Sequence, residues 1–203
     1  MTDPLPPRPD FERLEAAPPA SAERRTLILA LIGNLVFGWA NNESLFLYVV
    51  MLLLRTDQTS AALVFATLNT TRARLDLVQR LAKATITDRT LLRSLSRLID
   101  RFNECTRIRN EFNHCMYTLN ERGEITHTQS MRIQETRTGM KLGTTRPMDD
   151  ARIQEMVDTV NELIKINRDI WAFLPQLQAH LQSNKGVNPP SRDTGPSRPA
   201  TDG

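Results

Sequence analysis

The hydrophobic positions of this chain repeat with a helical period through most of its length. Apolar side chains recur every three or four residues, which is the spacing that places them on one face of an α-helix. The first of these stretches is apolar nearly all round, and this predicts a helix at the centre of the fold. The pattern therefore predicts an all-α protein, a four-helix bundle with helices over residues 23–55, 60–84, 88 to about 114–117, and from 149 onward.

Acidic residues and one proline define the ends of the last two predicted helices. Asp88 is a suitable N-cap for the third helix, and Asp149 and Asp150 suit the positive N-terminal end of the fourth. We expect Pro175 to bend the fourth helix or to end its first part, because proline lacks a backbone N–H and clashes with the preceding turn.

The period of the pattern changes between the third and fourth helices. Residues 120–123 form a good tight turn, residues 124–129 alternate and are rich in Thr, and Thr138-Gly139 offers a second turn. We therefore expect a small β-hairpin or three-stranded flap over residues 116–147. Because it follows His114 directly, two roles stay open, a flap that shapes or covers a site and a surface decoration.

Proline-rich polar stretches bound the helical region on both sides. Six prolines fall within residues 1–22 and four within residues 184–203. Such segments bury too little apolar surface to fold, so we expect a disordered N-terminal segment, a disordered C-terminal tail and one helical domain over residues 23–183. A length of 203 residues fits one domain with tails, and 40% hydrophobic residues are ordinary for a soluble globular protein.

Charge is distributed unevenly along the chain. A formal net charge of +3 does not by itself indicate a nucleic-acid binder. Between residues 72 and 109, however, ten Lys or Arg stand against four Asp or Glu. Two interpretations stay open: an electropositive surface that attracts a phosphate-bearing ligand, and the Arg-rich outer faces of two amphipathic helices.

The location suggested by the sequence is the cytoplasm. The apolar stretch Leu27–Leu54 is interrupted by Asn34 and by residues 41–44, which leaves pieces shorter than the ~20 residues that cross a bilayer. The N-terminus lacks the basic and then apolar pattern of a signal peptide. Cys105 and Cys115 fall on the apolar side of one predicted helix, ~15 Å apart at 1.5 Å rise per residue, so we expect two buried free thiols in a reducing compartment.

The segment Arg109-Asn110-Glu111-Phe112-Asn113-His114 carries the candidate chemistry. On a helical wheel with Arg109 at 0°, Asn113 falls at ~40°, Asn110 at ~100° and His114 at ~140°. A guanidinium that stays protonated can hold a phosphoryl group, and an imidazole can move protons near neutral pH. The bland interpretation is a solvated polar helix face. The apolar residues fall on the opposite side of the wheel: Cys105, Ile108, Phe112, Cys115 and Met116.

Polar residues inside the first helix form a second candidate group. Glu43 and Asn42 interrupt an apolar stretch, where a buried carboxylate is costly unless it is paired. Glu43 could pair with Arg109 or Arg107 and so position a substrate site, or form a structural ion pair with another arginine such as Arg72 or Arg74. Substrate contacts are therefore expected from four residues: Asn113, Arg107, Glu43 and Asn42.

A helical bundle with this segment late in its third helix resembles the HEPN superfamily of small α-helical domains. The family signature is Arg, four to six residues, then His, often with a polar residue directly after the Arg. It maps here onto Arg109, Asn110 and His114, and the resemblance covers roughly residues 23–182. The β insertion is a variation on the family pattern.

The resemblance implies a metal-independent endoribonuclease without a cofactor. Two domains would pair as a homodimer so that their Arg/His segments make one composite site. The RNA 2′-hydroxyl would attack the adjacent phosphate and leave a 2′,3′-cyclic phosphate. His114 would act as general acid or base, Arg109 would stabilise charge on the phosphoryl oxygens, and Asn110 would orient His114 or bind the phosphate.

Other functions also fit this sequence. Many prokaryotic HEPN proteins are toxins or phage-defence components, and a nucleotidyltransferase-like antitoxin would be a partner of such a toxin. A non-catalytic module that binds a nucleotide, RNA or a protein would use Arg109 and His114 as ligand contacts. In a structural or assembly protein the same face would be an interface.

Overall fold

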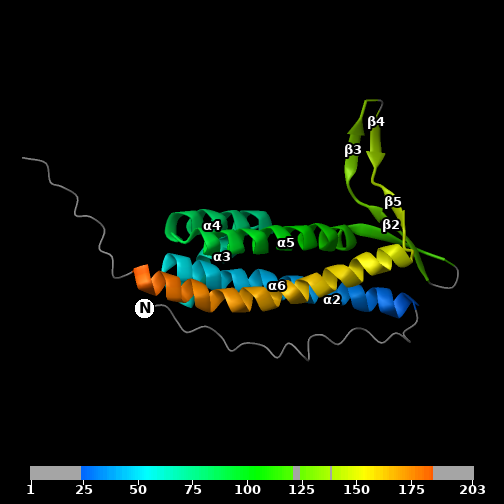
Figure 1. Ribbon diagram of the computed structural model, residues 1–203. Helices are drawn as coiled ribbons and strands as arrows, with labels where there is room; N and C mark the ends of the chain where they lie inside the picture. The colour runs from blue at the N-terminus through cyan, green and yellow to red at the C-terminus, as the bar shows by residue number, and fades with distance from the viewer. Residues whose placement is uncertain (1–23, 121–123, 138, 185–203) are drawn as a thin grey trace, which may run out of the picture.

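The computed structural model describes residues 24–120, 124–137 and 139–184 and is mainly helical (Figure 1). The expected N-terminal segment lies outside these residues, and so does the expected tail apart from Asn184, which caps the last helix. Within the described residues there are five helices: α2 (Arg24–Leu54), α3 (Gln58–Thr67), α4 (Thr71–Thr85), α5 (Arg89–Asn113) and α6 (Asp150–Ser183).

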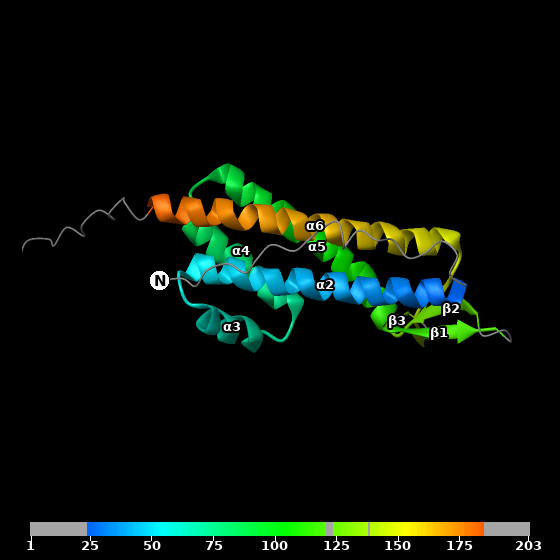
Figure 2. The ribbon, with the colours of Figure 1, turned by 90° about the horizontal axis from the view of Figure 1, so that it is seen from below.

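Helix α2 holds the central position that its composition predicts. It contacts the other four described helices, and α6 lies beside it along most of its length (Figures 1 and 2). By length and composition α2 could also cross a membrane, but half of its most apolar stretch is buried inside the fold. Burial in the core accounts for the apolar character of that half.

The single helix expected over residues 60–84 is wrong, because two helices occupy this stretch. Helix α3 starts after Asp57, whose carboxylate accepts a hydrogen bond from the Ser60 N–H at 2.9 Å. The break falls at residues 68–70, where Thr70 takes an extended conformation and its hydroxyl accepts from the Ala73 N–H at 3.1 Å. A side chain that caps a new helix satisfies donors that a continuous helix would satisfy internally.

Helix α5 begins where it was expected and ends earlier. Asp88 caps its first turn by accepting from the N–H groups of Thr90 and Leu91. The last helical residue is Asn113, and the expected extension toward residue 117 is wrong. The chain leaves the helix there because residues 115–119 pair with a second strand instead.

The β insertion expected over residues 116–147 is confirmed and consists of two small sheets. One is an antiparallel three-stranded sheet in the order β1 (Cys115–Leu119), β2 (Ile125–Ser130) and β5 (Thr145–Pro147). The other is a hairpin of β3 (Ile133–Thr136) and β4 (Gly139–Leu142), which projects away from the helices (Figure 1).

One glycine fixes the return from the projecting hairpin. Gly143 has a positive φ of +53°, and a Cβ there would lie 1.8 Å from the backbone oxygen of Ser130. Only glycine permits this close approach. The three-stranded sheet therefore closes directly beside the point where the hairpin leaves it.

Helix α6 runs through Pro175 and continues to Ser183, so the expectation that proline ends its first part is wrong. Pro175 is exposed. A proline on the solvent side of a helix leaves the freed carbonyl of the preceding turn open to water. The residues beyond Pro175 still bury Leu177 and Leu181 in the core.

Candidate functional site

Arg109 lies on the face of α5 that meets α2. Its guanidinium carbon is 3.4 Å from the centroid of the Trp39 ring, and its Nη1 donates to Oδ1 of Asn110 at 2.7 Å. Its Nε is buried and has no hydrogen-bond partner within the described part of the chain. Burial lowers the pKa of Arg109 while the charge of Glu43 raises it, and an arginine so placed remains a cation.

The position of Arg109 against Trp39 argues against the alternative of a solvated polar helix face at this residue. The indole of Trp39 stacks on Phe102 with ring centroids 6.0 Å apart, and its Nε1 donates to the Thr106 hydroxyl at 2.8 Å. The aromatic ring is therefore held on its edge and on one face. Arg109 covers another part of it, because a guanidinium gains both dispersion and electrostatic attraction over an indole.

His114 is the residue at which α5 becomes β1. Its N–H still donates to the Asn110 carbonyl at 3.1 Å, while its own carbonyl accepts from the Met131 N–H at 3.2 Å. The backbone is thus fixed from the helix and from the sheet. The side chain is exposed and forms no hydrogen bond with the described residues. Because φ is −124° and ψ is 41°, the wheel angle assigned to His114 no longer applies.

The two asparagines of the segment differ in their surroundings. Asn110 is half-buried, and its side-chain oxygen accepts from Arg109, so in this structure it positions the guanidinium. Its link to His114 is through the backbone carbonyl. Asn113 is exposed at the last helical position, beside His114 in the chain.

Arg107 is not brought together with Arg109. It points to the other side of α5, where it forms ion pairs with Glu104 at 2.7 Å and Glu111 at 2.8 Å. Side chains two positions apart on a helix, as Arg107 and Arg109 are, point in directions that differ by ~200°, which explains their separation. The expected substrate contact from Arg107 would therefore belong to a different face of the molecule.

The two polar residues inside α2 also have structural partners. Glu43 pairs with Arg74 at 2.8 Å and accepts from the Thr71 hydroxyl at 2.6 Å, so the alternative of an ion pair with another arginine is confirmed. Glu43 acts on Arg109 only through its charge.

Asn42 is fully buried, which contradicts a direct substrate contact. Its Nδ2 donates to the carbonyls of Gly38 and Leu163, both at 2.9 Å, and so ties α2 to α6. A polar side chain needs such partners when it is removed from water. The sequence marked the position as unusual, but it gave no sign that the partner would be a backbone carbonyl on a distant helix.

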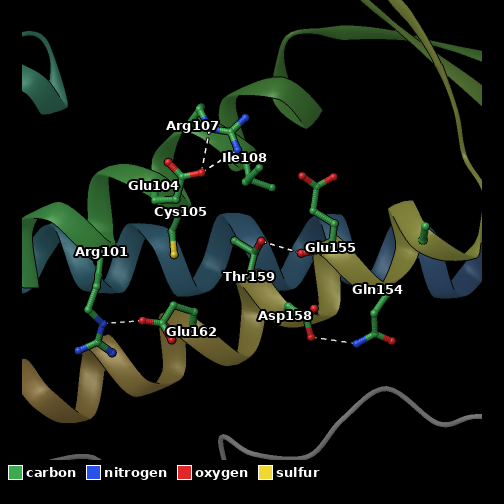
Figure 3. Close-up of a pocket in the computed structure, with 11 residues that line it drawn as sticks. Arg101, Glu104, Cys105, Arg107, Ile108, Gln154, Glu155, Asp158, Thr159 and Glu162 are labelled. Carbon is green, nitrogen blue, oxygen red and sulfur yellow. Dashed lines mark hydrogen bonds and ion pairs between the residues drawn. The ribbon is translucent and has the colours of Figure 1, made fainter.

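A hollow of about 610 Å³ lies between α5 and α6, on the side of Arg107 (Figure 3). Glu104, Glu155, Asp158 and Glu162 line it, and Arg101 pairs with Glu162 at 2.5 Å. Sequence reasoning missed this hollow because its acidic residues come from two helices. Within the described ranges, no group of His, Cys, Asp and Glu is arranged to hold a metal ion.

The two cysteines do not share a helix, since Cys115 lies in β1. Both are free, with Cys105 buried and Cys115 half-buried. Burial raises the pKa of the Cys105 thiol to about 12, and it also raises that of Cys115. Neither thiol is therefore prepared to act as a nucleophile near neutral pH.

No protein-family model, no curated protein and no solved structure matches this chain.

Proposed function

We propose that the chain is a metal-independent endoribonuclease whose site is built from Arg109 and His114. The observation that carries the proposal is the environment of His114, which combines a backbone held from both sides with an exposed imidazole. A residue that acts as general acid or base needs a fixed backbone position and a side chain that can reach the substrate. Arg109 adds a cation that Trp39 and Asn110 hold in one orientation.

The reaction assigned to this site is a transesterification within RNA. The ribose 2′-oxygen attacks the adjacent phosphorus as an imidazole takes its proton. The bond from phosphorus to the 5′-oxygen breaks, and a second imidazole, in its protonated form, gives that oxygen a proton. The products are a 2′,3′-cyclic phosphate and a 5′-hydroxyl. Arg109 stabilises the negative charge on the phosphoryl oxygens during the transfer.

A homodimer supplies the second imidazole. The Arg/His segment of one chain contains one histidine, His114, whereas the reaction needs two groups that transfer protons, a base and an acid. A two-fold axis doubles every group near it, so two copies of the segment would complete the site. The longer helices α2, α4, α5 and α6, with the segment late in the third of them, support a HEPN-like four-helix bundle. Many prokaryotic members of that family are toxins or phage-defence components, so the proposal extends to a cytoplasmic toxin or defence role with a nucleotidyltransferase-like antitoxin as its partner.

The direct test is cleavage of structured RNA by the purified full-length chain in EDTA. Cleavage should continue in the chelator and yield 2′,3′-cyclic phosphate ends, and a DNA strand of the same sequence should stay intact. His114→Ala should reduce the rate at least about 10²-fold, the usual contribution of general acid–base catalysis. Because His114 is exposed, this variant should keep the folded structure.

A contaminating ribonuclease and a loss of folding both need controls. His127→Ala removes another exposed histidine from the neighbouring strand β2 and should cleave at the wild-type rate. Arg109→Lys keeps the positive charge but not the planar contact with Trp39, so its cleavage rate should fall while its circular dichroism is unchanged. Equal cleavage by wild type and His114→Ala would contradict the proposal.

A non-catalytic binding module is the second candidate, and one observation favours it. Arg109 is half-buried and its guanidinium already has an aromatic partner and an amide partner. A cation used in this way can serve structure or ligand binding without chemistry. RNA that is bound but left intact by the wild type, with affinity reduced in Arg109→Lys, would favour this function.

A further inference from the structure

Helix α2 carries an exposed apolar face along its N-terminal half. Phe37 is 56% exposed and Leu29 is 52% exposed, and Val36 lies between them at 38%. We call this face the α2 stripe and define it by five exposed residues at helical spacing: Leu29, Gly33, Val36, Phe37 and Ala40. A large aromatic side chain in water beside other apolar residues is typical of a surface that binds a partner.

The α2 stripe lies next to the candidate site. Counted around the helix from Trp39, its residues fall at ~60° to ~160°. Trp39 itself points inward, where it holds Arg109. The stripe and the Arg109 cation are therefore neighbours on adjacent faces, and a molecule seated on the stripe would come to the edge of the Arg/His segment.

We propose that a second copy of this chain packs on the α2 stripe, with the two α2 helices antiparallel about a two-fold axis. This inference rests on the proposed function, because it names the face through which the second Arg/His segment arrives. Charge supports a self-contact. No charged residue occurs between Arg25 and Glu43, although the chain as a whole carries a formal +3. A two-fold interface sets a patch against its own copy, so any charge at its centre would face a like charge.

The shape of the stripe is also self-complementary. Gly33 and Phe37 are one helical turn apart on the same face, and a Cβ added at Gly33 meets nothing within 4 Å. Two antiparallel helices centred on Leu35 would place Phe37 of each copy over Gly33 of the other. Ala30 and Ala40 would face each other in the same register. Small residues opposite a large one allow two helices to approach closely.

A lipid surface fits these observations less well. An interfacial helix combines its apolar face with a charged, solvent-exposed opposite face, whereas the opposite face of α2 is the core of the fold, with Ile28, Leu31 and Leu35 almost fully buried. The stripe is also bordered by exposed Asn41 and Ser44. These residues suit the rim of a protein contact.

The test is the mass of the full-length chain in solution, measured by analytical ultracentrifugation from 1 to 100 µM. The wild type should be a dimer at the highest concentrations. Phe37→Arg and Gly33→Leu should each raise the dimer dissociation constant at least about 100-fold, because a two-fold contact counts each change twice. Gly33→Leu adds apolar surface, so only a closely packed neighbour explains its effect. Met140→Arg, at a 77% exposed position on β4, is the matched control and should dimerise normally.

Each outcome bears on the inference separately from the ribonuclease proposal. A wild type that stays monomeric at 100 µM overturns the inference. So does a wild type that binds anionic liposomes in a flotation assay when Phe37→Arg does not. Dimers that persist in both Phe37→Arg and Gly33→Leu also overturn it, and the proposed ribonuclease then stands if the wild type still cleaves RNA. Dimers that the two variants disrupt support the inference even if the wild type leaves RNA intact, in which case the ribonuclease proposal alone fails.

Discussion

The guanidinium of Arg109 lies over the ring of Trp39, with its carbon 3.4 Å from the ring centroid, although the two residues are 70 positions apart in the sequence. The contact joins the middle of α2 to the last turns of α5. Phe102 stacks on the same indole and Thr106 accepts its N–H. The cation of the candidate site is thus held by the core, and the stability of this region and the position of Arg109 depend on one aromatic ring.

Substitutions of Trp39 should separate these two dependences. Trp39→Phe keeps a ring beneath Arg109 but loses the hydrogen bond to Thr106, so it should lower the free energy of unfolding by about 1 kcal/mol. Trp39→Ala removes the ring and should lower it by about 3–5 kcal/mol. Urea denaturation followed by circular dichroism measures both values. A cost below about 1 kcal/mol for Trp39→Ala would show that the ring contributes little.

The ion pair between Glu43 and Arg74 should be coupled more strongly than the pairs on the surface. The Glu43 side chain is 12% exposed and that of Arg74 is 23% exposed, so water screens them poorly. A double-mutant cycle with Glu43→Gln and Arg74→Gln should give a coupling free energy of about 1–2 kcal/mol. The pair Arg24–Asp150, in which Asp150 is 92% exposed, is the control and should give less than about 0.5 kcal/mol. Equal coupling in both pairs would contradict the prediction.

Asn42→Asp should make folding stability depend on pH. The substitution keeps the shape but sets a carboxylate against the carbonyls of Gly38 and Leu163, which now accept from the amide. Burial raises the pKa of such a carboxyl in the folded state. The variant should therefore be most stable below about pH 4 and lose several kcal/mol as the pH rises through the raised folded pKa. Urea denaturation at pH 3.5, 5 and 7 tests this, and a variant that is as stable as the wild type at pH 7 would refute it.

The contribution of Glu111 to folding stability should rise with pH, in contrast to the effect of an aspartate at position 42. Burial raises its pKa, but the hydrogen bond and charge of Arg152 and the charges of Arg107 and Arg146 outweigh this and lower it. A carboxylate with a lowered folded pKa stabilises the fold above its unfolded pKa of about 4.3, and that contribution is lost as the pH falls. Glu111→Gln should cost about 1–3 kcal/mol at pH 7 and almost nothing below pH 3. A cost that is the same at both pH values would contradict this assignment.

The thiol of Cys105 should be inert in the folded protein. Its pKa is raised to about 12 by burial, so at pH 8 the thiolate, which is the reactive form, should be about 10³-fold scarcer than for an ordinary cysteine. In a Cys115→Ser variant, labelling with a disulfide reagent at pH 8 should be slower in native buffer than in guanidinium chloride by at least that factor. Comparable rates in the two conditions would show that the hollow beside Cys105 opens readily.

The sequence predicted those parts of the fold that depend on local patterns. The central place of α2, the cap at Asp88 and the β insertion after His114 all follow from spacing or from residue type. The split between α3 and α4 did not follow, because apolar spacing continues across the break at Thr70. The continuation of α6 past Pro175 depends on which side of the helix meets the solvent, and that is set by the other helices.

The candidate site shows the same division. The residues Arg109, Asn110 and His114 could be picked out from their types, and the structure keeps Arg109 beside Asn110. The part played by Trp39 could not be found, since the sequence does not show which side chains of another helix its ring contacts. Contacts between distant segments leave no pattern in the local sequence. The partners of Asn42 and Glu43 therefore depend on how the helices pack, and the sequence alone does not identify them.

The bond between the Met131 N–H and the His114 carbonyl restricts how the length of this region can vary. A deletion of one residue in the part of β1 or β2 next to His114 and Met131, such as Met116 or Gln129, would shift the register there, turn side chains to the other face and disturb this bond. Extra residues in the β3–β4 turn change neither strand and leave that bond in place. Related chains, and libraries made from this one, should therefore differ in length in the connections between strands, above all at the tip of the projecting hairpin, and keep the lengths of β1 and β2 constant. The same tip is the place for an inserted epitope or fluorophore.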